Sequence, residues 1–425
     1  MAPALRSITE HVERVLALVA PLPAVAAGLA ELVDGPPPVL AEDAVAADAV
    51  PPFDNSAMDG YAVRLADLPL SGEPVTLRVT GEIPAAAGSG ARLGPGEAVR
   101  IMTGAPLPPG ADAVVPVERT STGRFVAGAS ADETTVTLAR QARLHVRRRG
   151  EDVEPGTVLG HAGAEATATV VAALAASGLA AVRVHRRPRV AVIATGSELV
   201  PAGMPRRPGQ ITDSNSLMLA AAARATGSDV LRLGPVPDSA DALRATLDQA
   251  AGAGADLIVT AGGVSAGAAD VVREVLALGQ DAAVSDVDVA GVGMQPGRPQ
   301  ALARLRGVPW IAVPGNPVSA YVSFALFVRP AIARLRGLAV PGLAFEHRRT
   351  ASGWTSPPGR EQVLPVRVLP TGEVEPVLVA SGGGGGGHLV STLAGSDGLA
   401  VVAADVEKVG PGDVVRVLLH GAPRG

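Results

Sequence analysis

Hydrophobic residues near the start of the chain recur at helical spacing. The pattern predicts an amphipathic helix over residues 7–20, whose apolar stripe comprises Ile8, Val12, Val15, Leu16 and Val19. Ser7 and Glu10 stand three residues apart at its start, which is the spacing of a capping box. Pro21 ends this helix because proline lacks the N–H that a helix interior needs. A second helical stretch is expected near residues 24–33, before an Asp-Gly-Pro turn.

The rhythm changes to short strand-like runs between residues 75 and 146. Runs such as VTLRVTGEI and ADAVVPVE are each bounded by Gly or Pro, so the region is predicted to be a small β domain. A helical stretch over residues 164–178 follows, and it ends in a glycine suited to a helix C-terminus.

Strands and helices alternate from residue 188 onward. This alternation predicts a parallel-rich sheet covered by helices on both faces. Ligands bind beyond the carboxyl ends of such strands, so the loops that follow the ATG and TAGG sequences are the expected binding loops. After Gly337 the pattern is strand-like again, which predicts a C-terminal β-barrel-like domain. The predicted fold class is therefore a multidomain α/β protein.

Composition narrows the class of protein. The 425 residues include only two Trp, two Tyr and five Phe, so the cores must consist mainly of Ala, Val and Leu. The formal net charge of -5 gives no electrostatic case for nucleic acid binding. The absence of cysteine excludes disulfides, thiolate nucleophiles and zinc-thiolate sites, and it fits a reducing cytoplasm. No run reaches the ~18 uninterrupted apolar residues of a membrane span, so a soluble protein is expected.

Polar residues gather in the segment PPFDNSAMDGYAV (51–63). Asp54 and Asp59 can hold a hard divalent cation or share a proton, and Gly60 is expected to allow a sharp turn. The spacing of the two acids alone is more often that of an ordinary polar turn. The basic run over residues 147–149 is either a solvated turn or part of a site.

Three further loops place glycine, proline and polar residues at expected strand ends. The glycines of TAGGVSAG (260–267) let backbone N–H groups approach an anion such as a phosphate. Glu198 faces the same crevice, and Asp270 follows the glycine loop; a helix-capping role is the alternative for both acids. PGNPVS (314–319) is a rigid turn with Ser319 near the start of an apolar helix. It is suited to an oxyanion or a pterin edge, or it is simply a turn with an N-cap.

Eight blocks in chain order resemble the motifs of the MoeA and gephyrin E-domain family. They are residues 51–63, 99–118, 147–156, 188–203, 209–216, 260–270, 294–303 and 313–324. The resemblance implies four domains: a molybdopterin-binding αβα domain (1–22 and 186–336), a connecting domain (23–50 and 147–185), a β insert domain (51–146) and a C-terminal β-barrel-like domain (337–425). It also implies a homodimer in which the two subunits together complete a cleft.

The resemblance further implies a molybdopterin molybdenumtransferase. Such an enzyme inserts molybdate into adenylylated molybdopterin and releases AMP, in molybdenum cofactor biosynthesis. The implied cofactor is Mg²⁺, which would neutralise the pyrophosphate. The adenylyltransferase that supplies the substrate and apo-molybdoenzymes are further expected partners. Two alternatives stay open, a molybdopterin adenylyltransferase, which resembles only the middle domain, and a diverged, non-catalytic pterin-binding scaffold.

The functional positions of the family carry over residue by residue. The expected catalytic residues are Asp59, Thr103, Glu198, Asp238 and Asp270. The expected magnesium ligands are the four acids Asp59, Glu198, Asp238 and Asp270. The expected substrate-binding residues are Arg148, Arg149, Ser197, Gly262, Gly263, Ser265, Arg298, Pro314, Gly315, Asn316, Ser319 and Arg360. Arg360 resembles the family's arginine that is proposed to hold molybdate.

The chain departs from the family pattern in two places. Many members have three lysines in and before a Lys-Pro-Gly-Lys-Pro block, where this chain has Gly291, Gln295 and Arg298. Loss of two charges is expected to weaken the grip on an anionic substrate. The glycine run over residues 382–387 stands where relatives usually have a serine close to molybdate, so backbone N–H groups are expected to serve instead.

Overall fold

The chain forms two compact units. The computed structural model describes residues 5–85, 88, 92–125, 133–264, 270–278, 283–339, 342–377 and 388–421. The larger unit comprises Met1–Glu42, Ala162–Ala166 and Arg183–Gly425, and the smaller unit comprises Asp43–His161 and Thr167–Val182. The finer division into four domains stays a prediction.

The N-terminal helix α1 (Ile8–Leu18) confirms the predicted amphipathic helix. The backbone N–H of Glu10 donates to Ser7 Oγ at 3.1 Å, and the backbone N–H of Ser7 donates to the Glu10 carboxylate at 2.8 Å. This reciprocal pair is a capping box. The buried face of α1 comprises Ile8, His11, Val12, Val15 and Leu18.

The predicted second helix over residues 24–33 is wrong. This segment forms strand β1 (Ala24–Gly28) followed by the short 3₁₀ turn η1 (Leu29–Val33). Strand β1 pairs with β11 (Ala181–His185), which lies far away in the sequence. The helical spacing of apolar residues in this segment does not determine its structure, because pairing with a distant strand satisfies its backbone hydrogen bonds instead.

A six-stranded sheet with the order β15-β12-β16-β20-β19-β17 forms the centre of the larger unit. Its strands are β12 (Arg189–Thr195), β15 (Asp229–Val236), β16 (Leu257–Ala261), β17 (Val284–Gly291), β19 (Pro299–Leu305) and β20 (Val308–Val313). The first four strands in this order are parallel, as predicted. Strands β19 and β17 are antiparallel to their neighbours. Arg306 and Gly307, both at positive φ, form the two-residue hairpin turn that reverses the chain between β19 and β20.

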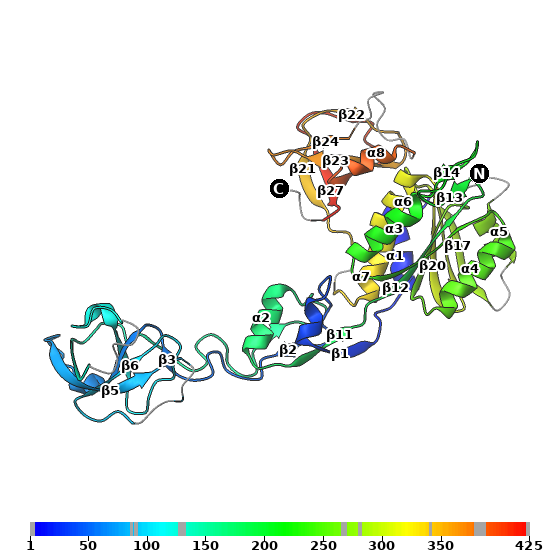
Figure 1. Cartoon of the computed structure of the whole chain (residues 1–425). Coiled ribbons are helices and arrows are strands. Elements are labelled where there is room, and N and C mark those ends of the chain that lie inside the picture. The colour runs from blue at the N-terminus through cyan, green and yellow to red at the C-terminus, as the bar shows by residue number, and fades with distance from the viewer. Residues whose placement is uncertain are drawn as a thin grey trace. The chain divides into compact units, whose positions relative to one another are not determined.

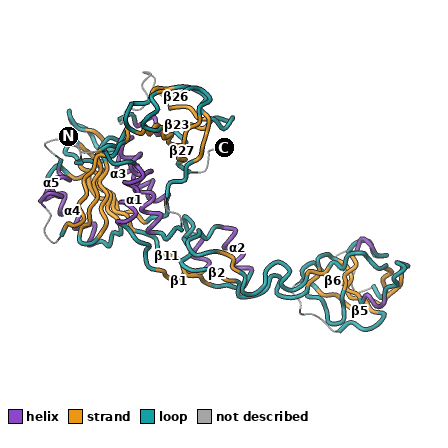
Figure 2. The backbone as a smooth tube through the Cα atoms, turned by 180° about the vertical axis from the view of Figure 1, so that it is seen from behind, coloured by secondary structure: helices purple, strands orange, loops and turns teal. Residues whose placement is uncertain are grey.

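Helices cover both faces of this sheet (Figures 1 and 2), as predicted. One face carries α1, α3 (Asn215–Ala225) and the consecutive helical segments α6 (Pro317–Ser323), η5 (Phe324–Val328) and α7 (Arg329–Leu335). The other face carries α4 (Ala240–Gly252) and α5 (Val271–Leu278). Along β12, Val190 and Val192 belong to the first core, and Ala191 and Ile193 belong to the second. Both faces of the strand are therefore apolar.

The helical segment Pro317–Leu335 is long and apolar enough to cross a membrane by length and composition. However, 78% of the relevant window is buried inside the protein, and Leu326 and Phe327 are completely buried. Its apolar composition therefore follows from its place in the protein core.

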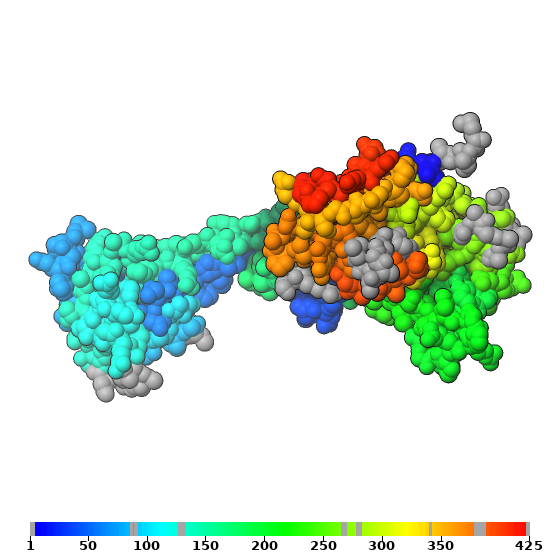
Figure 3. Space-filling model, turned by 90° about the horizontal axis from the view of Figure 1, so that it is seen from above, coloured from blue at the N-terminus to red at the C-terminus, as the bar shows by residue number. Residues whose placement is uncertain are grey.

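The C-terminal part of the larger unit is rich in β-structure, as predicted. Its main sheet has the order β18-β23-β25-β27-β21, with β24 added beside β23, and β22 pairs with β26. The elements are β18 (Met294–Gln295), β21 (Glu346–Arg349), β22 (Trp354–Thr355), β23 (Glu361–Val368), β24 (Val374–Pro376), α8 (Val390–Ala394), β25 (Gly398–Val402), β26 (Lys408–Val409) and β27 (Val414–Leu419). Figure 3 shows this part, in orange and red, against the yellow and green part of the same unit. Val363 and Leu418 join the core that lies under α6.

The smaller unit contains the predicted β insert. Its sheet has the order β7-β4-β6-β5-β8, with strands β4 (Gly60–Val63), β5 (Val75–Ile83), β6 (Glu97–Ile101), β7 (Ala113–Pro116) and β8 (Thr135–Leu138). The remaining elements of the unit are β2 (Ala44–Val45), β3 (Asn55–Ser56), η2 (Leu65–Asp67), η3 (Val117–Arg119), β9 (Val146–Arg147), β10 (Val158–Gly160) and α2 (Ala168–Ala176). Helix α2 confirms the predicted helix and is followed by Gly178 at φ +80°.

The expected sharp turn at Gly60 is wrong. Gly60 instead allows two strands to pack closely. It is the first residue of β4, which lies between β7 and β6. A Cβ atom at this position would lie 2.2 Å from the carbonyl oxygen of Val115 on β7. Only glycine therefore allows the two strands to approach as they do.

Candidate active site

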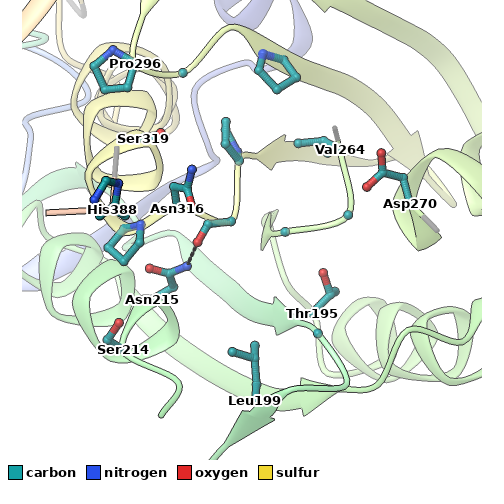
Figure 4. Close-up of a pocket in the computed structure, with 18 of the residues that line it drawn as sticks. Thr195, Leu199, Ser214, Asn215, Val264, Asp270, Pro296, Asn316, Ser319 and His388 are labelled. Atoms are coloured by element: carbon teal, nitrogen blue, oxygen red, sulfur yellow. Dashed lines mark hydrogen bonds between the residues drawn. The ribbon is translucent and has the colours of Figure 1, made fainter. Parts of the chain in front are cut away.

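A polar pocket of about 870 Å³ lies at the carboxyl ends of the parallel strands of the larger unit. Its walls come from the ends of β12, β16 and β20, from the segment around β18, and from the C-terminal β-rich part. Figure 4 shows Thr195 at the end of β12, Val264 after β16 and Asn316 after β20 around one space. This is where ligands bind in open α/β sheets, so the predicted location is supported.

Glu198 and Asp238 both line the pocket, and the backbone positions each of them. The backbone N–H of Ser197 donates to Asp238 Oδ2 at 2.9 Å, and the backbone N–H of Asp238 donates to Ser197 Oγ at 2.9 Å. The Glu198 carboxylate rests against Gly196, where an added Cβ would lie 2.6 Å from Glu198 Oε2. The turn after β12 thus keeps two exposed carboxylates at the strand ends.

The glycine loop after β16 approaches the neighbouring strands too closely for side chains. Gly262 and Gly263 have φ values of +107° and +69°. A Cβ at Gly262 would lie 2.6 Å from the carbonyl oxygen of Thr195. Asp270, which also lines the pocket, directly precedes α5. The predicted substrate-binding residue Ser265 lies outside the described residues.

The Pro314-Gly315-Asn316 turn connects β20 to α6, and all three residues line the pocket. Asn215, the first residue of α3, donates from Nδ2 to the carbonyl oxygen of Gly315 at 2.5 Å, as Figure 4 shows. Ser319 also lines the pocket, although the residue is only 5% exposed. Its hydroxyl makes no hydrogen bond within the described ranges. The first turn of α6 therefore carries a pocket-lining hydroxyl that has no partner among the described residues.

Two arginines and a histidine reach the pocket from other segments. Arg298 comes from the loop between β18 and β19, Arg360 directly precedes β23, and His388 lies just before α8. Gln295, at one of the two lost lysine positions, also lines the pocket. Sequence reasoning did not assign a role to His388, because no pattern connects a histidine after a glycine run with a strand-end pocket.

Sequence reasoning also missed Asp213 and Asn215, which line the same pocket. Asp213 is 2% exposed and accepts hydrogen bonds from the backbone N–H and the hydroxyl of Ser216, at 3.0 Å and 2.5 Å. Both missed residues belong to the block GQITDSNS, which supported only the family resemblance. The polar residues of this block could have been predicted to lie at the site.

The carboxylates that line the pocket suit a magnesium ion whose remaining ligands come from the bound substrate. Across the described ranges, no three Asp, Glu or His side chains are close enough together to form a metal site. Mg²⁺ usually takes one or two protein carboxylates and completes its shell with water and phosphate oxygens. Glu198, Asp238 and Asp270 line the pocket and can offer one or two such carboxylates, but the described residues do not form a metal site made only of protein ligands.

The remaining predicted site residues belong to the smaller unit. The backbone N–H of Thr103 donates to Asp59 Oδ1 at 2.7 Å, and the Thr103 hydroxyl donates to the same oxygen at 2.8 Å. Asp59 and Thr103, which were predicted as separate site residues, are thus hydrogen-bonded to each other. Asp59 is exposed, and its Oδ2 atom has no hydrogen-bond donor within the described residues.

Arg148 and Arg149 differ in their contacts. Arg148 forms an ion pair with Asp54 at 2.6 Å, and the backbone N–H of Arg149 donates to Asp54 Oδ1 at 2.7 Å. The backbone bond from Arg149, followed by the Arg148 side chain, lowers the pKa of Asp54 below its usual value. Asp54 therefore orders this turn as a carboxylate.

The α/β layers and the strand-end pocket define an enzyme-like small-molecule site. Three family models match the chain, namely the MoeA N-terminal region (domain I and II) over residues 6–178, the probable molybdopterin binding domain over residues 191–334, and the MoeA C-terminal region (domain IV) over residues 347–420. The matches follow one another along the chain and leave no large segment unmatched.

Relatives that match nearly the whole chain indicate the same family. The chain is 42% identical over 387 residues to molybdopterin molybdenumtransferase 2 of Mycobacterium tuberculosis, covering 89% of this chain and 91% of the relative. It is 36% identical over 441 residues to molybdopterin molybdenumtransferase 1 of the same organism, covering 97% and 98%. A crystal structure of the molybdopterin biosynthesis MoeA protein from Pyrococcus horikoshii superposes with a TM-score of 0.79 at 30% identity, covering 99% of this chain and 100% of that chain.

The chain therefore belongs to the MoeA family of molybdopterin molybdenumtransferases. It is a transferase with a role in molybdenum cofactor biosynthesis. The predicted family and class of enzyme are confirmed.

Proposed function

We propose that the chain inserts molybdate into adenylylated molybdopterin and releases AMP. The observation that carries this proposal is the composition of the strand-end pocket. Carboxylates, a glycine loop, three cationic or titratable side chains and a buried serine hydroxyl line one cavity of about 870 Å³. A pyrophosphate needs metal-binding acids and backbone donors, and an oxyanion needs cations and hydroxyl donors.

We assign the acids to magnesium and to the pyrophosphate. One or two of the carboxylates Glu198, Asp238 and Asp270 would hold Mg²⁺ in the larger unit, and the ion would neutralise the pyrophosphate charge when bound. Asp238 accepts the Ser197 N–H through Oδ2, so Oδ1 is the atom that remains for a metal or a metal-bound water. Gly262 and Gly263 line the same cavity. The backbone N–H of Gly262 donates to the carbonyl oxygen of Val313 at 3.0 Å, so we assign the phosphate oxygens to the N–H of Gly263.

We assign molybdate to the opposite set of groups. Arg298, Arg360 and Ser319 all line the cavity, and neither the two guanidinium groups nor the serine hydroxyl forms an ion pair or hydrogen bond within the described residues. Their donors are therefore available to a tetrahedral oxyanion. The dithiolene sulfurs that receive molybdenum belong to the substrate, which agrees with a chain that has no cysteine.

Asp59 and Thr103 are proposed to act together, since Thr103 fixes one oxygen of Asp59 through two hydrogen bonds. The other oxygen is then directed consistently for a metal ion or a water molecule. We further propose a homodimer in the cytoplasm, with the adenylyltransferase and apo-molybdoenzymes as transient partners. Light scattering should give twice the monomer mass, and a monomer at every micromolar concentration would contradict the dimer.

Substitution of the two most diagnostic acids tests the assignment. Glu198→Gln and Asp59→Asn should each lower magnesium-dependent cofactor formation about 100-fold or more, because amides bind Mg²⁺ poorly and transfer no proton. Both residues are exposed in loops, so the variants should melt like the wild type. Asp241→Asn is the matched control, because Asp241 is an exposed carboxylate on α4 outside the pocket. Normal turnover by Glu198→Gln or Asp59→Asn would remove that residue from the site.

A further inference from the structure

A buried glutamine lies behind the part of the pocket wall that the β18–β19 loop (residues 296–298) forms. Gln300 is the second residue of β19 and is completely buried. Its Nε2 atom donates to the carbonyl oxygen of Gly297 at 2.7 Å and to Ser323 Oγ at 2.7 Å. Ser323 is the last residue of α6 and is also completely buried. One amide therefore connects the middle of the loop to a helix of the main core.

Backbone hydrogen bonds hold the loop at both of its ends. Gln295 of β18 pairs with Gln362 of β23, and the backbone N–H of Val292 donates to the carbonyl oxygen of Arg298 at 2.7 Å. Among the described residues, the Gln300 amide is the one donor to the buried carbonyl of Gly297. A buried carbonyl that loses its donor stays unpaired or moves towards water. Removal of the amide should therefore displace the middle of the loop.

Packing alone does not explain a glutamine at position 300. Its Oε1 atom is buried and has no hydrogen-bond partner among the described residues. An unpaired buried amide oxygen is unfavourable, and an apolar residue of similar volume, such as methionine, would avoid it. Leu302 lies two residues further along β19, on the same face, and belongs to the apolar core that includes α6. The two hydrogen bonds of Nε2 are therefore what favours glutamine here.

The loop packs closely against α6 and carries a pocket-lining arginine. Gly297 has a φ value of +104°, and a Cβ atom there would lie 3.3 Å from Ser323 Oγ. Figure 4 shows Pro296 of the loop and Ser319 of α6 on the same side of the pocket. Arg298 directly follows Gly297, and its guanidinium forms no ion pair or hydrogen bond within the described ranges. The place of this guanidinium thus depends on where Gly297 is held.

We propose that Gln300 is a positioning residue for substrate binding, which holds the Gly297 carbonyl and thereby keeps the Arg298 guanidinium directed at an anionic substrate. The inference rests on the proposed function, which assigns Arg298 to molybdate. Gln300 is completely buried and does not touch the substrate itself. Loss of its amide should therefore weaken substrate binding and leave the reaction of the bound substrate nearly unchanged.

The test compares KM and kcat of cofactor formation, with molybdate and adenylylated molybdopterin varied in turn. Gln300→Met removes both hydrogen bonds and fills the same space, so it should raise the KM for molybdate about five- to ten-fold and change kcat less than about two-fold. Ser323→Ala is the matched control, because it removes a buried acceptor of the same amide and leaves the bond to Gly297 in place. It should keep the KM of the wild type, and melting curves verify that each variant is folded.

A double-substitution cycle tests whether Gln300 acts through the loop. Arg298→Ala should raise the KM by itself, and adding Gln300→Met should raise it less than about two-fold further, because the positioned group is gone. If Gln300→Met does not fold, Gly297→Ala displaces the loop without altering the glutamine. A Cβ atom at Gly297 would lie 2.8 Å from Met294 Cε, and its positive φ disfavours any side chain. Gly297→Ala should raise the same KM.

Three results would overturn the inference. They are an unchanged KM for both substrates in Gln300→Met or Gly297→Ala, an equal rise in Ser323→Ala, and an undiminished effect of Gln300→Met in the Arg298→Ala background. A rise for adenylylated molybdopterin in place of molybdate would support the role of Gln300 and assign Arg298 to the pyrophosphate. If the wild type forms cofactor and Gln300→Met keeps its KM values, only the role of Gln300 fails. If the wild type forms no cofactor, the proposed function and the inference fail together.

Discussion

His11 provides a measurable link between a buried side chain and the stability of the larger unit. It lies on α1 with no exposed surface, and its ring meets the ring of Phe327 edge-on at 4.6 Å. Arg6 NH1 lies 3.2 Å from its Nδ1 atom, and Arg6 also pairs with Asp288. Since the guanidinium can only donate, the ring proton must be on Nε2, which is buried and has no partner among the described residues. The ring is therefore neutral in the folded protein.

Protonation of His11 should destabilise the folded state. Burial, and then the charge of Arg6, lowers the pKa of His11 from 6.5 to about 4. The unfolded chain binds the proton first as the pH falls, so the stability due to neutral His11 is complete above pH 6.5 and is lost as the pH falls towards 4. This amounts to about 2 kcal/mol at about pH 5, and about 3 kcal/mol when the pH reaches the folded-state value.

The variant His11→Leu isolates this effect because leucine fills the apolar site without titrating. Urea unfolding is followed by tryptophan fluorescence, which reports on the larger unit because Trp310 and Trp354 both belong to it. Between about pH 7 and about pH 5, the wild type should lose about 2 kcal/mol more free energy of unfolding than the variant. An equal loss in both proteins would show that His11 accepts a proton without cost, and the reasoning from burial would be refuted.

Two further substitutions test local features of the fold and the site. Gly60→Ala should destabilise the smaller unit by about 3 kcal/mol, because the added Cβ meets the carbonyl oxygen of Val115; an unchanged melting temperature would contradict the close strand contact. Gln295→Lys should tighten the binding of adenylylated molybdopterin about ten-fold, less so at high salt, because it restores a cation to the pocket. Equal affinity of the wild type and the lysine variant at both salt concentrations would mean that Arg298 and backbone donors already saturate the site.

The parts of the fold that depend on local periodicity could be predicted. α1 was predictable because its apolar stripe and capping box lie within one short segment. β12 and β16 were predictable because a strand with two buried faces is apolar throughout. The segment 24–33 was not, because the partner of β1 lies about 150 residues further along the chain. The antiparallel edge of the main sheet depends on a hairpin whose first turn residue is Arg306, which is not a typical residue for positive φ.

The residues of the candidate site likewise include some that the sequence predicts and some that it does not. Gly262 directly follows β16, and Glu198 and Ser319 lie in the segments after β12 and β20, so the rule for ligand sites in α/β sheets locates all three in the pocket. His388 reaches the pocket only through the packing of α8 on α6, which no sequence pattern reveals. Gly60 was recognised as important for the wrong reason, because a close contact between strands cannot be distinguished from a turn in a single sequence.

The most direct test of the central claim is a defined assay of molybdenum insertion. The purified protein is mixed with adenylylated molybdopterin, molybdate and Mg²⁺, AMP is quantified, and the product is measured by activation of an apo-molybdoenzyme. AMP and active cofactor should appear together in equal amounts, both should depend on molybdate and Mg²⁺, and Glu198→Gln should abolish both. Cofactor formation no faster than in the absence of protein, or AMP release without molybdenum insertion, would contradict the account.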